Sequence, residues 1–202
     1  VLINHGSTAT IDNLLSNSSK IYVVNDSKLE INKDAEFYEF DEDETHLIIK
    51  DSKLEINKDV FFGGTHLIIK DDSNTTINGE LSVTGSGDIE FVNGEFVVND
   101  GGTKIDKSNL KVVGEVEFYN SDTELDRSKA NFNDKLTLID SAMLLKNSSS
   151  LNVGGVADFE DSALVVQNGS KVMFGNNFTM KNGEAEKSII ILDNGSEINI
   201  KG

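Results

Sequence analysis

The sequence predicts an all-β fold: a parallel β-helix, or β-solenoid, with three short strands in each coil. Three observations predict it. A segment near the N-terminus is duplicated with nearly identical residues, and a period of about 20–21 residues continues through the rest of the chain. Within each period, short runs alternate apolar and polar residues. A fixed period of this length is typical of solenoids, whose coils stack to bury a continuous core.

The duplicated segment fixes the length of one coil. "SKLEINKDAEFYEFDEDETHLIIKD" spans residues 27–51, and "SKLEINKDVFFGGTHLIIKD" spans residues 52–71. We interpret each copy as one coil, and the extra residues of the first copy as a loop that leaves the coil at a corner. This loop is placed at 35–44. A second loop is placed at 181–187, where "KNGEAEK" lengthens the period.

Three strands per coil are predicted because the alternating runs fall into three series, each with the coil period. Period-2 alternation is the pattern of a strand with one buried face. Equivalent positions should therefore stack into columns. One predicted interior column contains Ile49, Ile69, Phe91, Val112, Phe132, Val153 and Phe174.

The corners between these strands are rich in Asn, Asp, Ser, Gly and Lys, which favour turns. We expect a single domain over 1–202 with about nine coils, and an irregular cap or broken first coil over 1–18. The period exceeds the about 18 residues per turn of a left-handed hexapeptide helix. The sequence therefore favours right-handed winding.

Composition excludes several classes of function. The chain contains no cysteine, so it has no disulfide and no thiolate metal site. It has 35 acidic against 18 basic residues, a net charge of −17. That charge argues against nucleic acid as a partner, because nucleic-acid binding depends on cationic side chains. No apolar run approaches the about 20 residues needed to span a bilayer, so we expect no membrane insertion.

The strings "GGTKIDKSNLKVVGEVEFYNSDTELDRSKANF" and "NSSSLNVGGVADFEDSALVVQNGSKVMF" carry S-x-L-x-V and G-x-V-x-F strands. Through them, residues 19–202 resemble the passenger regions of bacterial autotransporters and filamentous-haemagglutinin-type adhesins. The resemblance implies a right-handed β-helix that is secreted and displayed at the cell surface. It also implies a non-enzymatic structural or adhesive role, with a host-cell or neighbouring-cell surface as partner.

Two other functions fit the same fold. A polysaccharide-processing β-helix enzyme would need convergent carboxylates in a groove, and Asp134, Asp158 and Glu160 are available. However, one arginine, no tryptophan and three tyrosines make a poor carbohydrate groove. A viral tail-fibre segment is the other alternative, and it should trimerise.

Two sets of residues are candidate metal ligands. Glu39, Asp41 and Asp43 in "EFDEDET" offer oxygens that calcium prefers, but they lack the D-x-D-x-D-G spacing, which favours a solvated acidic loop and no cofactor. His46 and His66 should stack on adjacent coils with outward side chains. No third ligand follows by spacing, so the duplication itself explains the pair.

Outward apolar residues and the chain ends suggest interaction surfaces. The outward candidates for an apolar patch are Ile48, Ile68, Val97, Val113 and Val165. The chain stops soon after a strand, at "SEINIKG", and an uncapped strand edge is a template for further pairing. We expect either end-to-end self-association into a filament or continuation of a longer solenoid.

Overall fold

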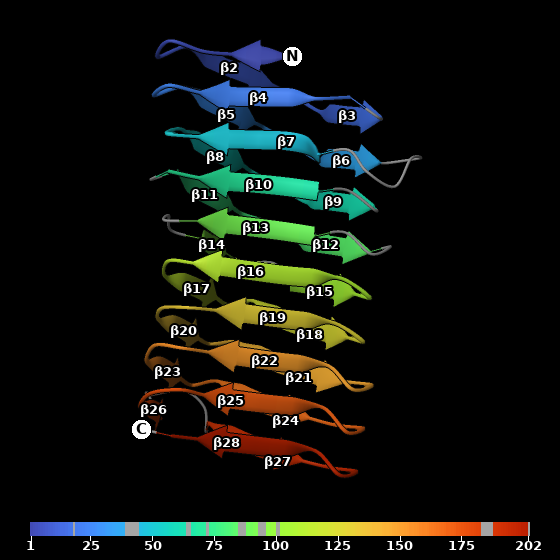
Figure 1. Cartoon of the computed structure of the whole chain (residues 1–202), viewed down its shortest axis with the longest axis vertical. Coiled ribbons are helices and arrows are strands. Elements are labelled where there is room, and N and C mark those ends of the chain that lie inside the picture. The colour runs from blue at the N-terminus through green and yellow to red at the C-terminus, as the bar shows by residue number, and fades with distance from the viewer. Residues whose placement is uncertain are drawn as a thin grey trace.

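The computed structural model is a stack of coils in which every third strand belongs to the same parallel sheet (Figure 1). It describes residues 1–17, 19–38, 45–63, 66–71, 73–84, 88–92, 96–99, 102–182 and 188–201. No helix occurs in this part of the chain. The all-β parallel solenoid predicted from the period is confirmed.

Three sheets form the sides of the stack. Sheet A has ten strands: β1 (Leu2–Ile3), β4 (Ile21–Val24), β7 (Thr45–Lys50), β10 (His66–Lys70), β13 (Asp88–Val92), β16 (Asn109–Val113), β19 (Lys129–Phe132), β22 (Ser150–Val153), β25 (Lys171–Phe174) and β28 (Glu197–Ile200). Sheet B has nine: β2 (Thr8–Ile11), β5 (Lys28–Ile31), β8 (Lys53–Ile56), β11 (Asn74–Ile77), β14 (Phe96–Asn99), β17 (Val116–Tyr119), β20 (Leu136–Ile139), β23 (Ala157–Glu160) and β26 (Phe178–Lys181). Sheet C also has nine: β3 (Leu14–Asn17), β6 (Ala35–Tyr38), β9 (Val60–Gly63), β12 (Leu81–Thr84), β15 (Gly102–Asp106), β18 (Asp122–Asp126), β21 (Ala142–Lys146), β24 (Ala163–Val166) and β27 (Ile189–Leu192).

The strand register confirms that the residues predicted for the interior column are partners from coil to coil. Ile49 pairs with Ile69, and the pairing continues through Phe91, Val112, Phe132 and Val153 to Phe174. The column lies in sheet A, and equivalent columns of sheets B and C meet it in one apolar core. Aromatic rings also stack between coils: the Phe37 and Phe62 centroids are 4.8 Å apart. Because each coil packs only on its neighbours, the core runs the length of the stack.

The first part of the loop predicted at 35–44 is a regular strand. Residues 35–38, placed in the first loop, form β6, and Ala35 and Phe37 are buried. "AEFY" alternates apolar and polar residues as the other strands do, and it pairs with β3 and β9. Residues 39–44 lie outside the described residues. So do residues 183–187 of the second predicted loop, whose first residue, Lys181, ends β26.

The N-terminal segment is not a broken coil over its described residues 1–17. It contributes one strand to each sheet, and these strands pair in register with β4, β5 and β6. Its apolar residues are few, but Ile3, Ala9, Ile11 and Leu14 occupy the inward positions. Residues 1–17 do alternate apolar and polar residues, but the runs are short and interrupted by polar residues, so the pattern was not recognised as three strands.

At several corners, a residue with left-handed backbone angles precedes a buried serine. Asp51, Arg127 and Asp140 have φ of 48°, 52° and 49°, and each is followed by a serine that is 2–5% exposed. The left-handed residue reverses the chain direction, a conformation that Asn and Asp adopt more readily than other non-glycine residues. The serine that follows points into the stack.

Side-chain ladders join the coils at these corners. The serine hydroxyls accept hydrogen bonds from the backbone N–H of the serine one coil earlier, at 3.1 Å for the pairs Ser128–Ser149 and Ser149–Ser170. Half-buried asparagines also bond from coil to coil through their side-chain amides: Asn99 donates to Asn78, and Asn78 donates to Asn57, both at 3.1 Å. These ladders satisfy polar groups that the turns would otherwise leave buried without partners.

Candidate interaction surfaces

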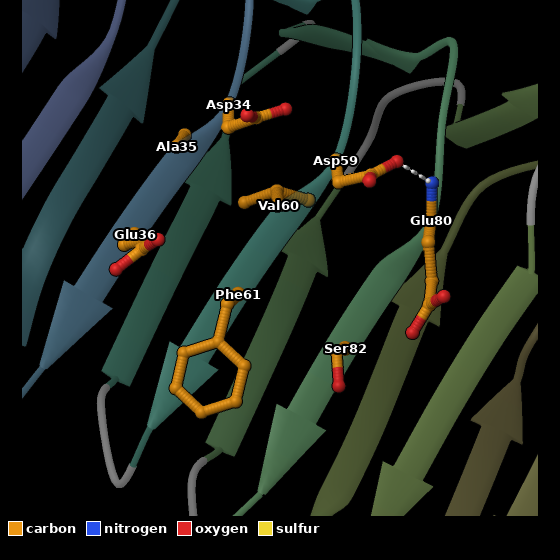
Figure 2. A pocket seen from close by; sticks show the side chains of 8 residues that line it. All are labelled: Asp34, Ala35, Glu36, Asp59, Val60, Phe61, Glu80 and Ser82. Atoms are coloured by element: carbon orange, nitrogen blue, oxygen red, sulfur yellow. Dashed lines mark hydrogen bonds between the residues drawn. The ribbon is translucent and has the colours of Figure 1, made fainter.

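A groove on the outer face of sheet C gathers acidic residues from three successive coils (Figure 2). Asp34, Asp59 and Glu80 occupy equivalent corner positions, each directly before a strand of sheet C. Glu36, Phe61 and Ser82 are partners in register on β6, β9 and β12. The cavity measures about 320 Å³. We call it the acidic groove.

Backbone and side-chain hydrogen bonds hold two of the carboxylates. Asp59 Oδ1 accepts a hydrogen bond from the backbone N–H of Glu80 at 2.9 Å, which fixes the corner (Figure 2). Glu36 accepts one from the Tyr38 hydroxyl at 2.9 Å. The hydrogen bond to Glu36 raises the pKa of Tyr38 above its usual value, because the carboxylate favours the protonated phenol.

An aromatic pair lies beside these carboxylates. The rings of Tyr38 and Phe61 are 5.2 Å apart and inclined by 42°. Gly63, the in-register partner of Tyr38, leaves room for them. A Cβ at Gly63 would lie 2.8 Å from Phe61 Cε1 and 3.4 Å from Tyr38 Cδ1. The groove thus combines an aromatic surface with four carboxylates.

The carboxylates of this groove are not balanced by bases. Several carboxylates elsewhere do pair with bases between coils, as Glu55 does with Lys28 at 2.7 Å and Asp106 with Arg127 at 3.0 Å. Among the described residues, no ion pair involves Asp34, Glu36, Asp59 or Glu80. Neighbouring like charges repel, so this face carries an unbalanced negative potential that attracts cationic groups.

The predicted apolar residues fall on all three sheets. Ile48 and Ile68 are direct partners on sheet A, and Tyr22 and Leu2 continue their column toward the N-terminus. Val97 lies on sheet B and Val113 at the end of β16 in sheet A, each half-buried. Val165 lies on sheet C. The structure therefore brings Ile48 and Ile68 together and separates the other three.

The neighbours of Val165 were missed by sequence reasoning. Leu144 and Ile191 are its partners on β21 and β27, and Ile191 is 42% exposed. Val165 and Leu144 line a cavity of about 430 Å³ together with Ala142. The sequence did contain a signal for this cluster. Positions 144, 165 and 191 lie between the two inward residues of successive pairs in the third series, and all three are apolar.

Of the candidate metal ligands, the structure describes only the backbone of His46 and His66. Glu39, Asp41 and Asp43 lie outside the described residues. His66 pairs with Thr45 and not with His46, because the register of β7 and β10 shifts between His66 and Leu67. The expected stacking of the two histidines is therefore wrong at the level of the backbone: β7 holds one extra residue there. Among the described residues, no group of three or more His, Cys, Asp or Glu side chains is placed to hold a metal ion.

The fold defines the class of this protein: a three-sided parallel β-solenoid. Comparison with protein-family models, with curated proteins and with solved structures found no significant match. Within the described residues, no helix has the length and apolarity to cross a membrane.

Proposed function

We propose that this chain is a non-enzymatic, extracellular structural or adhesive β-solenoid, part of a bacterial surface adhesin or of a surface filament. The observation that supports this most directly is the continuity of the three sheets. Each strand between the terminal coils is bonded to the coil before and the coil after it. Such a stack is stiff along its axis, as a spacer or display rod needs to be.

The outer faces supply the contacts of an adhesive rod. The acidic groove presents four carboxylates beside Phe61 and Tyr38, and sheet C presents Leu144, Val165 and Ile191 further along the stack. A negative face speeds encounter with a basic partner surface, whereas an exposed apolar patch contributes burial once contact is made.

The last coil supports the proposal that further solenoid packs on this end. Ile190, Leu192 and Ile200 occupy inward positions, yet they are 40%, 51% and 47% exposed. Their partners one coil earlier, Leu164, Val166 and Phe174, are buried. Another coil would cover these residues and pair their strand edges, whether it comes from a longer chain or from a second copy.

Negative-stain electron microscopy together with sedimentation at several concentrations tests this function. Fibres one solenoid wide that lengthen with concentration would support a filament subunit. A monomeric rod that binds cells in an adhesion assay would support an adhesin segment. A discrete trimer would favour the viral tail-fibre alternative, and a rod without cell binding or self-association would contradict the proposal.

One observation favours the enzyme alternative enough to test it. On sheet B, Glu117, Asp158 and Glu160 lie around one groove. A glycoside hydrolase needs two free carboxylates at a set spacing. Here Glu117 accepts a hydrogen bond from the Tyr119 hydroxyl at 2.8 Å, and Asp158 pairs with Lys135 at 3.6 Å. We therefore interpret the groove as non-catalytic. Release of reducing ends from a polysaccharide by the purified chain would contradict that interpretation.

A further inference from the structure

We infer that the groove on the outer face of sheet B binds a neutral sugar unit of an oligosaccharide. Its floor is formed by Thr137 and Ile139, both on β20. Glu117 and Tyr119 on β17 are their partners on one side, and Asp158 and Glu160 on β23 are their partners on the other. We call this the β20 groove. Its volume is about 260 Å³.

The hydroxyl of Thr137 is the first observation that points to a ligand. Thr137 lies on the outward side of β20, because Leu136 and Leu138 occupy the inward positions. Nevertheless it is only 8% exposed, and its Oγ1 is buried without a hydrogen-bond partner. A buried hydroxyl without a partner is destabilising, so such groups usually have one. A ligand hydroxyl in the groove would supply it.

The polar groups around the floor are mixed in character. Three carboxylates accept hydrogen bonds, and the ammonium groups of Lys135 and Lys181 donate them. These charges nearly cancel, in contrast to the acidic groove, which has carboxylates and no base among its lining residues. A nearly neutral set of hydrogen-bond donors and acceptors favours a ligand whose groups both donate and accept hydrogen bonds. The neighbouring hydroxyls of a sugar do so, whereas a simple cation or anion does not.

Apolar surface in the same groove fits the other side of a sugar ring. Ile139 is half-buried on the floor, and the ring of Tyr119 is its in-register neighbour. Ligand sites typically combine apolar walls with a few placed polar groups that fix orientation. A pyranose presents C–H groups on its faces and hydroxyls at its edge, so it can use both. The low aromatic content of the whole chain argued against a carbohydrate groove. In the β20 groove, however, Tyr119 lies beside the polar groups, and a single aromatic ring there can contact one sugar ring.

Two charged side chains that line the groove with Thr137 are only weakly held. Lys135 and Asp158, whose side chains are 40% and 34% exposed, are joined by an ion pair at 3.6 Å. A half-exposed pair of this kind contributes little stability. A ligand hydroxyl that enters the groove can therefore displace this ion pair at small cost.

The test is titration of the purified chain with maltotetraose and with cellotetraose, followed by ligand-observed NMR and calorimetry. We expect one of the two to bind, with an affinity in the millimolar to micromolar range that is typical of a small polar ligand on an open groove. Thr137→Val keeps the shape of the side chain and removes its hydroxyl. It should weaken binding by about three- to tenfold, the loss expected for one neutral hydrogen bond.

Thr76→Val is the matched control, because Thr76 also lies on the outer face of sheet B but outside the β20 groove. It should leave binding unchanged. Thermal denaturation of the Thr137→Val variant provides a second readout: its stability should be unchanged or raised, since the hydroxyl has no partner in the free protein. The inference is overturned if neither tetrasaccharide binds, if Thr137→Val and Thr76→Val bind alike, or if Thr137→Val is clearly destabilised.

Discussion

The backbone N–H of Ser128 donates a hydrogen bond to the hydroxyl of Ser149, one coil further along the chain, at 3.1 Å. The Ser149 hydroxyl in turn lies 2.9 Å from the carbonyl oxygen of Leu125 and 2.7 Å from that of Lys146. One buried side chain thus joins two corners. This relationship recurs along the stack, so the corners are held by side chains where the sheets end.

Replacing Ser149 by alanine should destabilise the protein by about 1–3 kcal/mol, because the Ser128 N–H would then be buried without an acceptor. Chemical denaturation measures the change. Ser82→Ala, a half-buried serine on the outer face of sheet C, is the control and should change stability by less than about 0.5 kcal/mol. Equal effects of the two substitutions would show that the ladder contributes no stability.

Phe132→Ala should be among the most destabilising single changes, costing about 3–5 kcal/mol. Phe132 is 1% exposed and lies in the interior column between Val112 and Val153. Its truncation leaves a cavity that rigid neighbouring coils cannot fill. Phe61→Ala removes the same ring from the outer face, where it is half-exposed, and should cost much less. The two midpoints of urea denaturation compare them directly.

Hydrogen exchange of the Phe132→Ala variant should show where the damage spreads. In a solenoid each coil contacts only its neighbours, so protection should fall in β16, β19 and β22 more than in distant coils. A uniform loss of protection along the chain would contradict this local response.

The three sheets, their columns and most of their register were predictable from the sequence, because apolar alternation directly encodes which residues face inward; the shift between β7 and β10 at His66 was not. Each series of alternating pairs corresponds to one sheet, as Ile49, Ile56 and Phe62 illustrate for sheets A, B and C. β6 was missed because "AEFY" runs into the acidic stretch after Tyr38, and polarity there suggested a loop. The right-handed winding stays a prediction, since inward and outward alternation is the same for either hand.

The surfaces were harder to predict, since a groove depends on outward residues of several coils at once. The acidic groove combines Asp34, Asp59 and Glu80, which are separated by a full coil in sequence and resemble ordinary corner residues one at a time. Phe61 was a usable signal: it is a large aromatic residue at an outward position. The β20 groove depends on the burial of the Thr137 hydroxyl, which no sequence pattern reports.

Gly155→Ala should destabilise by about 1–3 kcal/mol through steric overlap. A Cβ at Gly155 would lie 2.5 Å from both the carbonyl carbon and the oxygen of Asp134, which belong to the backbone of the preceding coil. The overlap cannot be relieved by rotating a side chain, so the corner must shift. Asn176→Ala changes an exposed corner residue one coil further and serves as the control. Thermal denaturation of the two variants distinguishes them; equal melting temperatures would contradict the overlap.

Asp126 should contribute a pH-dependent part of the stability. The amide of Asn147 donates a hydrogen bond to Asp126 at 2.9 Å, and this bond is the main cause that lowers the pKa of Asp126 below its ordinary value; the charges of Arg127 and Lys146 add to it. A carboxyl with a lowered pKa in the folded state stabilises the fold fully above its ordinary pKa of about 4, and the contribution is lost as the pH falls through the folded-state value.

The Asn147→Ala variant removes the main cause of that shift. We expect its free energy of unfolding to fall below that of the wild type at neutral pH, and the difference to shrink as the pH is lowered below about 4. Urea denaturation at a series of pH values measures this difference. Asn147 also accepts a hydrogen bond from Asn168, which in turn accepts one from Asn194. Asn168→Ala removes these two bonds but leaves the bond between Asn147 and Asp126 intact, so it is the control. A difference independent of pH would show that the amide acts on packing alone.

The acidic groove should behave as an unbalanced cluster of charge. Glu80→Gln removes one of its four carboxylates while keeping the shape of the side chain, so it should raise stability by a few tenths of a kcal/mol at low salt, on the scale of about 0.2–1 kcal/mol seen for exposed charge interactions. The gain should shrink with added salt, since screening weakens repulsion between exposed carboxylates. Glu55→Gln is the opposite case, because Glu55 pairs with Lys28 at 2.7 Å, and it should lower stability or leave it unchanged. Chemical denaturation at low and high salt compares the two variants. If Glu80→Gln is destabilising at low salt, the groove carboxylate has a favourable partner, and the interpretation of this face as an unpaired anionic surface is wrong.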